Sequence, residues 1–459
     1  MQDFKHLTNK KRFSLFQQSK ASQDNKRLEA TGVSVSRELR LPSGKRLQRL
    51  KYLLLFLAIV LGLTPVFLSV FRQTPDIKAA LISRFSKASD NTAAAKEKPT
   101  PPSAFESASK LLVSAAPSGG LFTAKTDLGE TLHYSINGNL QKRVHDFMAS
   151  HKVPYGVFVA IEPNTGRILA MTSHSSVEPQ WNQHSYYDIY PMASLFKIVT
   201  ASAALENKKI NPQTVIEFRG RAVSENPKYW DASPKGRNNR MDVTFAMGKS
   251  VNPVYGKIAA DLAGKNAVME SIQRFGFNQS ILTGLPVKAS MTSNPKDNRE
   301  LMLMGAGLDH DVKISPIHAA TIIAAIANGG SMMLPRLTDR MVSPSGTITE
   351  LPASREIRRL VTPETAASLT KMLSTTVTTG TSRKAFHDRK GRPQIRLDIA
   401  AKTGSISGTE PKGHYSWFAA YAPSSNPRIA VVALVINQDK WKIKASQVGE
   451  QALEEFFRK

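Results

Sequence analysis

Hydrophobic and polar positions alternate in patterns that predict strands toward both ends of the globular part of the chain and helices between them. Strands are predicted in five short apolar runs: 155–161, 167–172, 395–403, 415–421 and 428–436. The first two runs flank a Glu-Pro-Asn-Thr-Gly turn at 162–166, which indicates a β-hairpin. Helical periodicity occurs in seven segments: 140–150, 194–206, 253–263, 266–275, 316–328, 363–377 and 445–457. Two early strands, a helical middle and three late strands indicate a mixed α/β fold with a largely antiparallel sheet.

The pattern before this region is different. Residues 52–71 form an uncharged apolar run of 20 residues, about 30 Å long as a helix, which is enough to cross a bilayer. Six basic residues crowd its N-terminal side: Arg37, Arg40, Lys45, Arg46, Arg49 and Lys51. The positive-inside rule therefore predicts a cytoplasmic N-terminus, with the bulk of the chain outside, in the periplasm or extracellular space. Both the basic leader and the apolar run are too long for a cleaved signal peptide, so we expect an uncleaved, single-pass anchor in the plasma (inner) membrane.

These changes in composition and hydropathy divide the chain into four expected segments. They are a basic cytoplasmic tail (1–51), a transmembrane signal anchor (52–71), a linker rich in Ala, Ser, Pro and Lys (72–120), and a globular catalytic domain (121–459). The proline cluster of the linker is typical of a semi-extended spacer.

The composition and net charge of the chain exclude some kinds of site and partner. The chain has no cysteine, which leaves neither a disulfide framework nor a thiolate metal site. Its net charge is +26, of which +9 belongs to residues 1–51 and +17 to the residues after the apolar run. A basic N-terminal arm can bind nucleic acid, but the adjacent span favours a solvated cytoplasmic tail, so we expect no nucleic acid partner. The charge of the outer part suits either anionic wall polymers or simple solvation.

No metal or cofactor is expected from the sequence. Asp309-His310-Asp311 is a cluster of metal-ligand residue types. Consecutive residues rarely converge on one ion, so we predict a solvated turn there. His414 is predicted to be a loop residue, and Trp417 and Phe418 are predicted to pack within a sheet.

The candidate chemistry begins with Ser194 and Lys197. Residues three apart on a helix lie on one face, about 5–6 Å apart at Cβ, so the lysine amine can reach the serine hydroxyl. A serine hydroxyl is a weak nucleophile until a neighbouring base takes its proton. The same spacing occurs at 107/110, 293/296 and 368/371. The spacing alone is therefore weak evidence for a catalytic pair, and the support for Ser194 and Lys197 comes from the motifs that follow them.

Two short motifs follow. Ser250-Val251-Asn252 precedes a predicted helix, and Lys402-Thr403-Gly404-Ser405 ends a predicted strand. Ser-x-Asn also occurs at 135–137 and 224–226, whereas Lys-Thr-Gly occurs once. The first residues of the three motifs, Ser194, Ser250 and Lys402, are 56 and then 152 residues apart. In this order, the motifs resemble the active site of penicillin-binding proteins and serine β-lactamases. Further segments agree with that resemblance: 162–171, 305–307, 315–316, 327–330 and 380–381.

The resemblance implies a fold and a set of roles. It implies a largely antiparallel sheet covered by helices plus an all-helical lobe, preceded by one transmembrane helix. It makes Ser194 the acylated nucleophile and Lys197 its base, whose pKa must be lowered by burial or by a second cation such as Lys402. Ser250 would pass the proton to the leaving amine, and Asn252 would hold Lys197 and the peptide bond of the substrate.

The last motif is expected to bind the end of the substrate. The resemblance implies that the hydroxyls of Thr403 and Ser405 hold a terminal carboxylate, helped by the charge of Lys402, with Gly404 in the same strip. Backbone N–H groups of Ser194 and Ser405 would form the oxyanion hole.

The chain also departs from the family pattern. Met192-Ala193 stands where the family often has Pro-Gly before its serine, and Ser405 stands where Thr is common. Neither change removes a functional group. Upstream, about 50 linker residues follow the span. They leave no room for a glycosyltransferase domain or for the large pedestal of many monofunctional members.

The function that the resemblance implies is a membrane-anchored peptidoglycan D,D-transpeptidase, inhibited by β-lactams and partnered by stem peptides and by proteins of cell-wall synthesis. A D,D-carboxypeptidase or a β-lactamase would use the same residues with water as acceptor. A non-catalytic penicillin sensor or scaffold is the alternative from another class. The complete motif set argues against a scaffold, and the single span without an effector domain argues against a sensor. We see no glutamate signature between Asn252 and Lys402 for rapid hydrolysis by a β-lactamase.

Overall fold

The computed structural model describes residues 104–112, 116–118, 121–350 and 354–458. The expected cytoplasmic tail and signal anchor, 1–51 and 52–71, lie outside the described residues. Within the described ranges, no helix is long and apolar enough to span a membrane. The chain divides into two units, 1–99 and 100–459, and the second unit contains every element described below.

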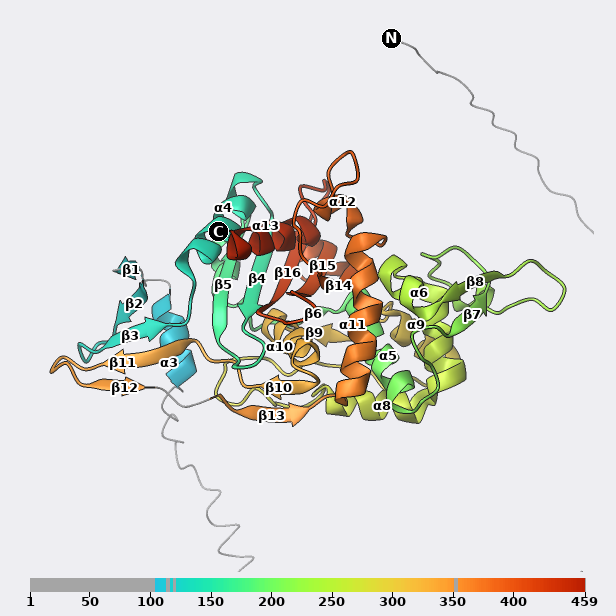
Figure 1. Cartoon of the computed structure of the whole chain (residues 1–459), viewed down its shortest axis with the longest axis horizontal. Helices are drawn as coiled ribbons and strands as arrows, with labels where there is room; N and C mark the ends of the chain where they lie inside the picture. The colour runs from blue at the N-terminus through green and yellow to red at the C-terminus, as the bar shows by residue number, and fades with distance from the viewer. Residues whose placement is uncertain (1–103, 113–115, 119–120, 351–353, 459) are drawn as a thin grey trace, which may run out of the picture. The chain divides into compact units, whose positions relative to one another are not determined.

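A five-stranded antiparallel sheet forms the centre of this unit (Figure 1), with the strand order β14-β15-β16-β4-β5. Its strands are β4 (Tyr155–Ile161), β5 (Ile168–His174), β14 (Ala400–Thr409), β15 (Lys412–Ala422) and β16 (Ile429–Asn437). The hairpin predicted around 162–166 is confirmed by the pairing of β4 with β5. Every residue of β4 and β16 is buried. Their nearly continuous apolar sequences follow from burial on both faces of the sheet.

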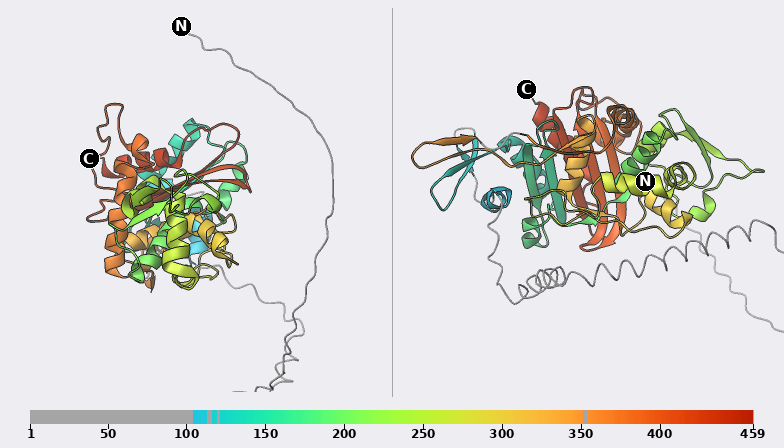
Figure 2. Two further views of the ribbon diagram at one scale, coloured as in Figure 1. Left: turned by 90° about the vertical axis from the view of Figure 1, so that its right-hand side faces the viewer. Right: turned by 90° about the horizontal axis from the view of Figure 1, so that it is seen from below.

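Helices cover both faces of this sheet (Figure 2). Alternate side chains of β4 point to opposite sides. Phe158 packs in one core cluster with residues of α4 (Gly138–Ser150) and α13 (Ala445–Phe457). Val157 belongs to the other cluster, with α10 (Pro316–Ala327). The mixed α/β fold with a largely antiparallel sheet is thereby confirmed. Trp417 and Phe418 are fully buried in β15, as expected for sheet packing.

A second lobe is built mainly from helices. They are η4 (Ala193–Phe196), α5 (Lys197–Glu206), α6 (Val243–Lys249), α7 (Asn252–Lys257), the π-helix η6 (Ile258–Ala263), α8 (Gly264–Arg274) and α9 (Asn298–Ala306). α11 (Pro363–Thr378) lies between this lobe and the sheet (Figure 1). The expectation of an all-helical lobe is wrong in one respect. The lobe carries the antiparallel pair β7 (Val215–Phe218) and β8 (Asn239–Asp242), with the short helix η5 (Pro227–Tyr229) between them.

Smaller elements complete the unit. A second five-stranded sheet has the order β1-β2-β3-β11-β12, and two-stranded pairs join β10 to β13 and β6 to β9. The bounds of the remaining elements are α3 (Ala104–Leu111), β1 (Ala116–Ser118), β2 (Leu121–Lys125), β3 (Thr131–Tyr134), η3 (Pro179–Gln183), β6 (Tyr190–Pro191), β9 (Lys313–Ile314), β10 (Ser331–Met333), β11 (Thr338–Val342), β12 (Ile348–Glu350), β13 (Glu356–Arg359) and α12 (Arg383–Phe386). α3 and β1 fall within the expected linker, 72–120. The Tyr134 hydroxyl donates to Ala108 O at 2.8 Å and ties α3 to the second sheet.

The strand predicted at 395–403 is misplaced. β14 begins at Ala400 and continues through Thr409, because its ladder with β15 runs without a break from Ala400↔Tyr421 to Thr409↔Lys412. The Lys-Thr-Gly motif therefore lies inside a long strand rather than at its end. The ladder also continues past Ser405, which pairs with Ser416.

Candidate active site

Ser194 lies on the 3-10 turn η4, at the entrance to α5. Two hydrogen bonds anchor the chain where it enters the turn: Met192 N donates to Val312 O at 2.9 Å, and Trp417 Nε1 donates to Pro191 O at 2.8 Å. Ala193 has a φ of +54°, in the left-handed region that costs a residue with a side chain free energy. Ser194 itself is only 8% exposed. The nucleophile candidate is thus held in a rigid, largely buried turn.

Lys197 begins α5 and is fully buried. Its Nζ lies 2.8 Å from Ser194 Oγ and 2.8 Å from Asn252 Oδ1, and it also donates to Ala306 O. The Asn252 amide is oriented by its own Nδ2, which donates to Ser224 O at 3.2 Å. Burial first, and the nearby charge of Lys402 second, hold the pKa of Lys197 well below its usual 10.5. Both effects make the neutral amine more accessible than it is for a lysine in water.

The partners of this amine fix its chemistry. A neutral amine has two N–H donors and one lone pair. Asn252 Oδ1 and Ala306 O can only accept hydrogen bonds, so they take both N–H groups. The lone pair is left for the Ser194 hydroxyl proton, which is the arrangement a general base requires.

Ser250 and Lys402 form a second pair of the same kind. Ser250 caps the C-terminus of α6 in the left-handed conformation, with φ +57° and ψ +46°. The fully buried Lys402 donates from Nζ to Ser250 Oγ at 2.8 Å and to Thr403 O at 2.7 Å. Burial lowers the pKa of Lys402 to about 7. This cation can therefore lose or gain its proton near neutral pH.

The strand β14 runs beside the Ser194 turn. A Cβ on Gly404 would lie 3.1 Å from Ala193 Cβ, so the two segments are in close contact there. The Thr403 Oγ1 is half-buried and lies 2.6 Å from Thr381 Oγ1, while Ser405 is exposed. β14 is the terminal strand of the sheet order, so one side of its backbone has no strand partner in the described part of the chain.

The structure thus brings together residues far apart in the sequence. Two hydrogen-bonded clusters form the site. The first contains Ser194, Lys197 and Asn252. The second contains Ser250, Lys402 and Thr403. Gly404 packs against Ala193, the residue before Ser194, and Ser405 follows Gly404 on β14. The sequence assigned no role in the site to four residues that contribute to it: Ser224, Ala306, Gly307 and Thr381. The last three lie in segments that agree with the family resemblance, but their contacts were not predicted. Two of the four contribute backbone carbonyls, which no sequence motif marks.

The residues that the sequence left aside remain outside this site. In the described ranges, no group of three or more His, Cys, Asp or Glu side chains could hold a metal. Asp309 instead accepts from Ser293 Oγ at 2.8 Å and from Asp311 N at 2.9 Å. The prediction of a loop at His414 is wrong, because His414 lies in β15 and pairs with Ser407 and Asn437. Its ring stacks on Trp441, with ring centroids 5.8 Å apart.

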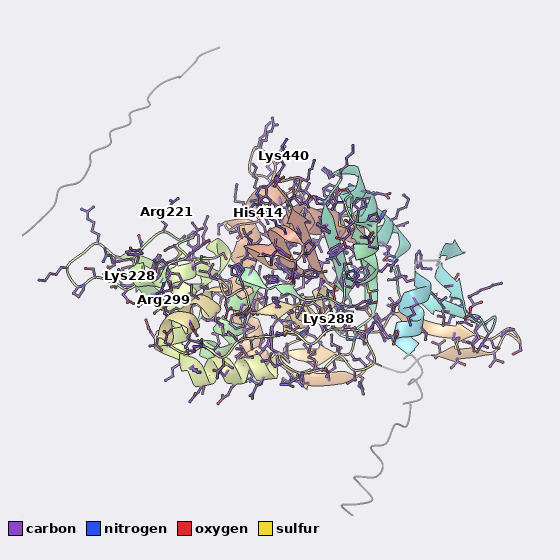
Figure 3. The ribbon with its side chains drawn as sticks, turned by 180° about the vertical axis from the view of Figure 1, so that it is seen from behind. Arg221, Lys228, Lys288, Arg299, His414 and Lys440 are labelled. Carbon is purple, nitrogen blue, oxygen red and sulfur yellow. The ribbon has the colours of Figure 1, made fainter. Side chains whose placement is uncertain are left out.

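A basic segment forms one wall of the site. Residues 219–240 pass over Asn252, whose backbone N–H donates to Ala222 O at 2.8 Å. The segment holds six basic and two acidic residues. Figure 3 shows Arg221 and Lys228 on this lobe, with Arg299 nearby. This side of the site therefore carries positive charge.

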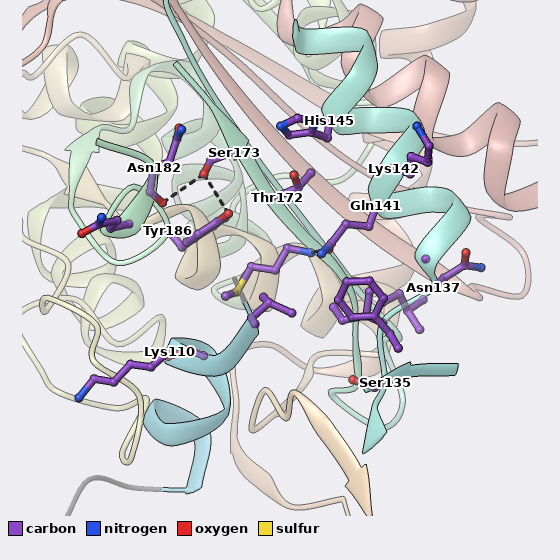
Figure 4. A pocket seen from close by; sticks show the side chains of 18 of the residues that line it. Lys110, Ser135, Asn137, Gln141, Lys142, His145, Thr172, Ser173, Asn182 and Tyr186 are labelled. Atoms are coloured by element: carbon purple, nitrogen blue, oxygen red, sulfur yellow. Dashed lines mark hydrogen bonds between the residues drawn. The ribbon is translucent and has the colours of Figure 1, made fainter. Parts of the chain in front are cut away.

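A separate groove lies elsewhere in the described part of the molecule (Figure 4). Its volume is about 1480 Å³, and its lining includes Lys110 of α3, Gln141 and His145 of α4, and Ser173 of β5. β5 and β14 are at opposite ends of the sheet order. Four strand spacings place them about 19 Å apart. None of the candidate site residues Ser194, Lys197, Ser250, Asn252 and Lys402–Ser405 lines this groove.

Known proteins resemble this chain in sequence and in fold. Residues 156–458 match the family model of the penicillin binding protein transpeptidase domain. The peptidoglycan D,D-transpeptidase PbpA of Mycobacterium tuberculosis is 27% identical over 352 residues, which cover 69% of each chain. Stage V sporulation protein D of Bacillus subtilis is 24% identical over 340 residues, which cover 68% of this chain and 50% of that protein. The penicillin G acyl-enzyme complex of penicillin-binding protein A from M. tuberculosis superposes with a TM-score of 0.57 at 25% identity, over 71% of this chain and 80% of that one.

Proposed function

Because the chain belongs to the penicillin-binding protein transpeptidase domain family, we propose that it is a membrane-anchored peptidoglycan D,D-transpeptidase acting through a Ser194 acyl-enzyme. The observation that carries this proposal is the Lys197 amine, whose two acceptor-only partners leave its lone pair facing the Ser194 hydroxyl. A relative with this named activity, PbpA of M. tuberculosis, supports the choice of substrate class.

In the first half-reaction, Lys197 takes the Ser194 proton and Oγ attacks the carbonyl carbon between two terminal D-Ala residues. Backbone N–H groups of Ser194 and Ser405 stabilise the oxyanion of the tetrahedral intermediate. The C–N bond then breaks, and the proton reaches the leaving amine through Ser250. The products are free D-Ala and an ester on Ser194.

The terminal carboxylate of the donor is held by Thr403, Ser405 and the Lys402 ammonium. A carboxylate beside Lys402 favours the charged form of this lysine, opposing the effect of burial. In the second half-reaction, an amine of a neighbouring stem peptide attacks the ester. A new amide forms, and the Ser194 hydroxyl regains its proton.

The site is proposed to work outside the cytoplasm, as a periplasmic or extracellular domain on a single-pass anchor. The uncharged run at 52–71 and the basic residues before it support this topology. The proposed division is a tail (1–51), an anchor (52–71), a linker from 72 and a catalytic domain (121–459), with α3 and β1 added to its edge. Association with other proteins of cell-wall synthesis stays a prediction.

The test uses the full-length protein with donor and acceptor stem peptides. Cross-linked dimers are expected as products, together with one D-Ala for each bond formed. Release of D-Ala without dimers would instead make the protein a D,D-carboxypeptidase. Ser194→Ala should abolish labelling by fluorescent penicillin. Ser368→Ala, at another Ser-x-x-Lys match, should label like the wild type. Labelling that survives Ser194→Ala would overturn the proposal.

A further inference from the structure

The loop after α11 contacts both lobes of the site. Gly380 and Thr381 lie between α11 and α12. Thr381 N donates to Gly248 O at 3.0 Å, in the last turn of the helix that Ser250 caps. The Thr381 Oγ1 lies 2.6 Å from Thr403 Oγ1 on β14. Thr381 is therefore bonded through its backbone to the Ser250 segment and through its side chain to the Lys-Thr-Gly strand.

The position of this loop is set by contacts that leave no space for a side chain. A Cβ on Gly380 would lie 2.2 Å from Gly248 O, and a Cβ on Gly248 would lie 2.4 Å from Thr375 Oγ1. The Thr375 hydroxyl donates to Thr244 O at 2.9 Å and joins α11 to α6. Because the backbone at Thr381 is fixed in this way, its hydroxyl is presented to Thr403 at a fixed place.

The direction of the bond between the two threonines matters for binding an anion. Each hydroxyl has one proton to donate and can accept as well. To hold a carboxylate, Thr403 must donate its hydroxyl proton to that group. In the bond between the two threonines, Thr403 Oγ1 must then accept and Thr381 Oγ1 must donate. Hydrogen bonds in such a chain strengthen one another. Without Thr381, the Thr403 hydroxyl could rotate away from the substrate.

We propose that Thr381 is a positioning residue that makes the site selective for substrates ending in a carboxylate, by orienting the Thr403 hydroxyl toward that group. The proposal rests on the proposed function, in which Thr403 holds the terminal carboxylate of the donor. Thr381 itself does not touch the reacting atoms.

The experiment measures acylation of Ser194 in the full-length protein by benzylpenicillin and by its methyl ester, which lacks the charge. The ratio of the two rate constants reports selectivity and is independent of the fraction of active protein. Thr381→Val should lower this ratio about tenfold, because hydrogen bonds to charged groups are among the stronger ones in proteins. Thr381→Ser should restore it.

Thr379→Val is the matched control. Thr379 is also exposed, but its hydroxyl donates to Thr375 O at 3.3 Å within its own helix. The ratio should stay at the wild-type value in this variant. Equal losses for the acid and the ester in Thr381→Val would contradict the proposal, because a merely structural defect would affect both compounds alike.

A double-mutant cycle separates positioning from direct binding. Thr403→Val should lower the ratio by itself, and adding Thr381→Val should lower it no further. Additive losses would mean that Thr381 binds the carboxylate directly and would overturn the inference. A wild-type protein that is not acylated at all would instead refute the proposed function, so the two failures are distinguishable.

Discussion

At the scale of single residues, the two buried lysines differ in what they contact. Lys197 faces two carbonyl oxygens and a hydroxyl, whereas Lys402 faces the Ser250 hydroxyl and the Thr403 carbonyl. Two like charges buried close together disfavour each other, so protonation of one lysine opposes protonation of the other. We therefore expect Lys197 to serve as base while Lys402 carries the positive charge.

The pH dependence of acylation should reveal this coupling. Protonated Lys197 cannot accept a proton, so the rate of penicillin acylation should fall as pH drops through the pKa of this lysine, well below 10.5. Lys402→Gln should move the midpoint of this limb to higher pH, since the charge of Lys402 is one cause of the lowering. The midpoint is obtained from acylation rates across the pH range. An unchanged or lower midpoint in Lys402→Gln would contradict the assignment.

The lifetime of the penicillin adduct is also decided by the residues around Ser194. In the part of the chain that the structure describes, no Asp or Glu hydrogen-bonds to Ser194, Lys197 or Asn252. A base that activates a deacylating water is therefore lacking among the direct partners of these residues. The adduct should persist for many minutes, as followed by mass spectrometry of the intact protein. Rapid penicillin turnover without an adduct would move the assignment to a β-lactamase.

At the scale of elements, the Ser194 turn depends on the end of α9. Gly307 caps that helix with φ +71°, and a Cβ there would lie 2.3 Å from Ala193 O and 2.8 Å from Ser194 Cα. The same helix end presents Ala306 O to Lys197. One glycine therefore allows α9 to approach both the nucleophile and its base.

Gly307→Ala should disrupt this approach. The left-handed conformation alone costs alanine about 1–2 kcal/mol, and the overlap should further displace the turn, so acylation should fall sharply. Gly329→Ala is the control, because Gly329 has φ +61° with no atom within 4 Å of the added Cβ. In denaturant unfolding, the free energy of unfolding of the control should fall only by the cost of the left-handed backbone conformation. Its acylation rate should equal that of the wild type. Normal acylation in Gly307→Ala would show that the turn does not depend on this contact.

Periodicity in the sequence predicted the helices that have a strong pattern of buried positions. It failed for elements whose presence or length depends on packing against other elements. α4, α10, α11 and α13 agree with their predicted positions to within about two residues. α6 and α9 were missed, although their N-caps Asp242 and Asp297 are typical helix-start signals. The extent of β14 depends on its partner β15, which local sequence does not encode.

In the candidate site, too, the sequence predicted some contributors and not those that depend on tertiary packing. The order of the three motifs indicated which side chains would meet. The Ala306 carbonyl and the Thr381 hydroxyl could not be found in this way. They lie 109 and 22 residues from the groups that they contact, and only tertiary packing brings them there.

At the scale of the whole molecule, the proposed topology can be tested directly. A reporter enzyme that is active only outside the cytoplasm, inserted after Gly120, should be active in cells. Replacing the six basic residues before the span by glutamine should reduce that activity, because they orient the helix. The same replacements among the basic residues of 1–35 are the control and should have less effect. Cytoplasmic activity of a reporter at this position would refute the anchor.

The order of strands in the central sheet has a consequence for how the protein is made. β16 (Ile429–Asn437) lies between β15 and β4 (Tyr155–Ile161), so the early hairpin has no neighbour until the last part of the chain is synthesised. The lobe at 192–306 is continuous in sequence and can form from local contacts. The sheet must wait, since pairing between distant segments is slow. In a chain translocated across a membrane during this delay, the central sheet would still be unformed. A nonsense mutation before Ile429 would leave the edge of β4 open to pairing with other chains, which favours aggregation.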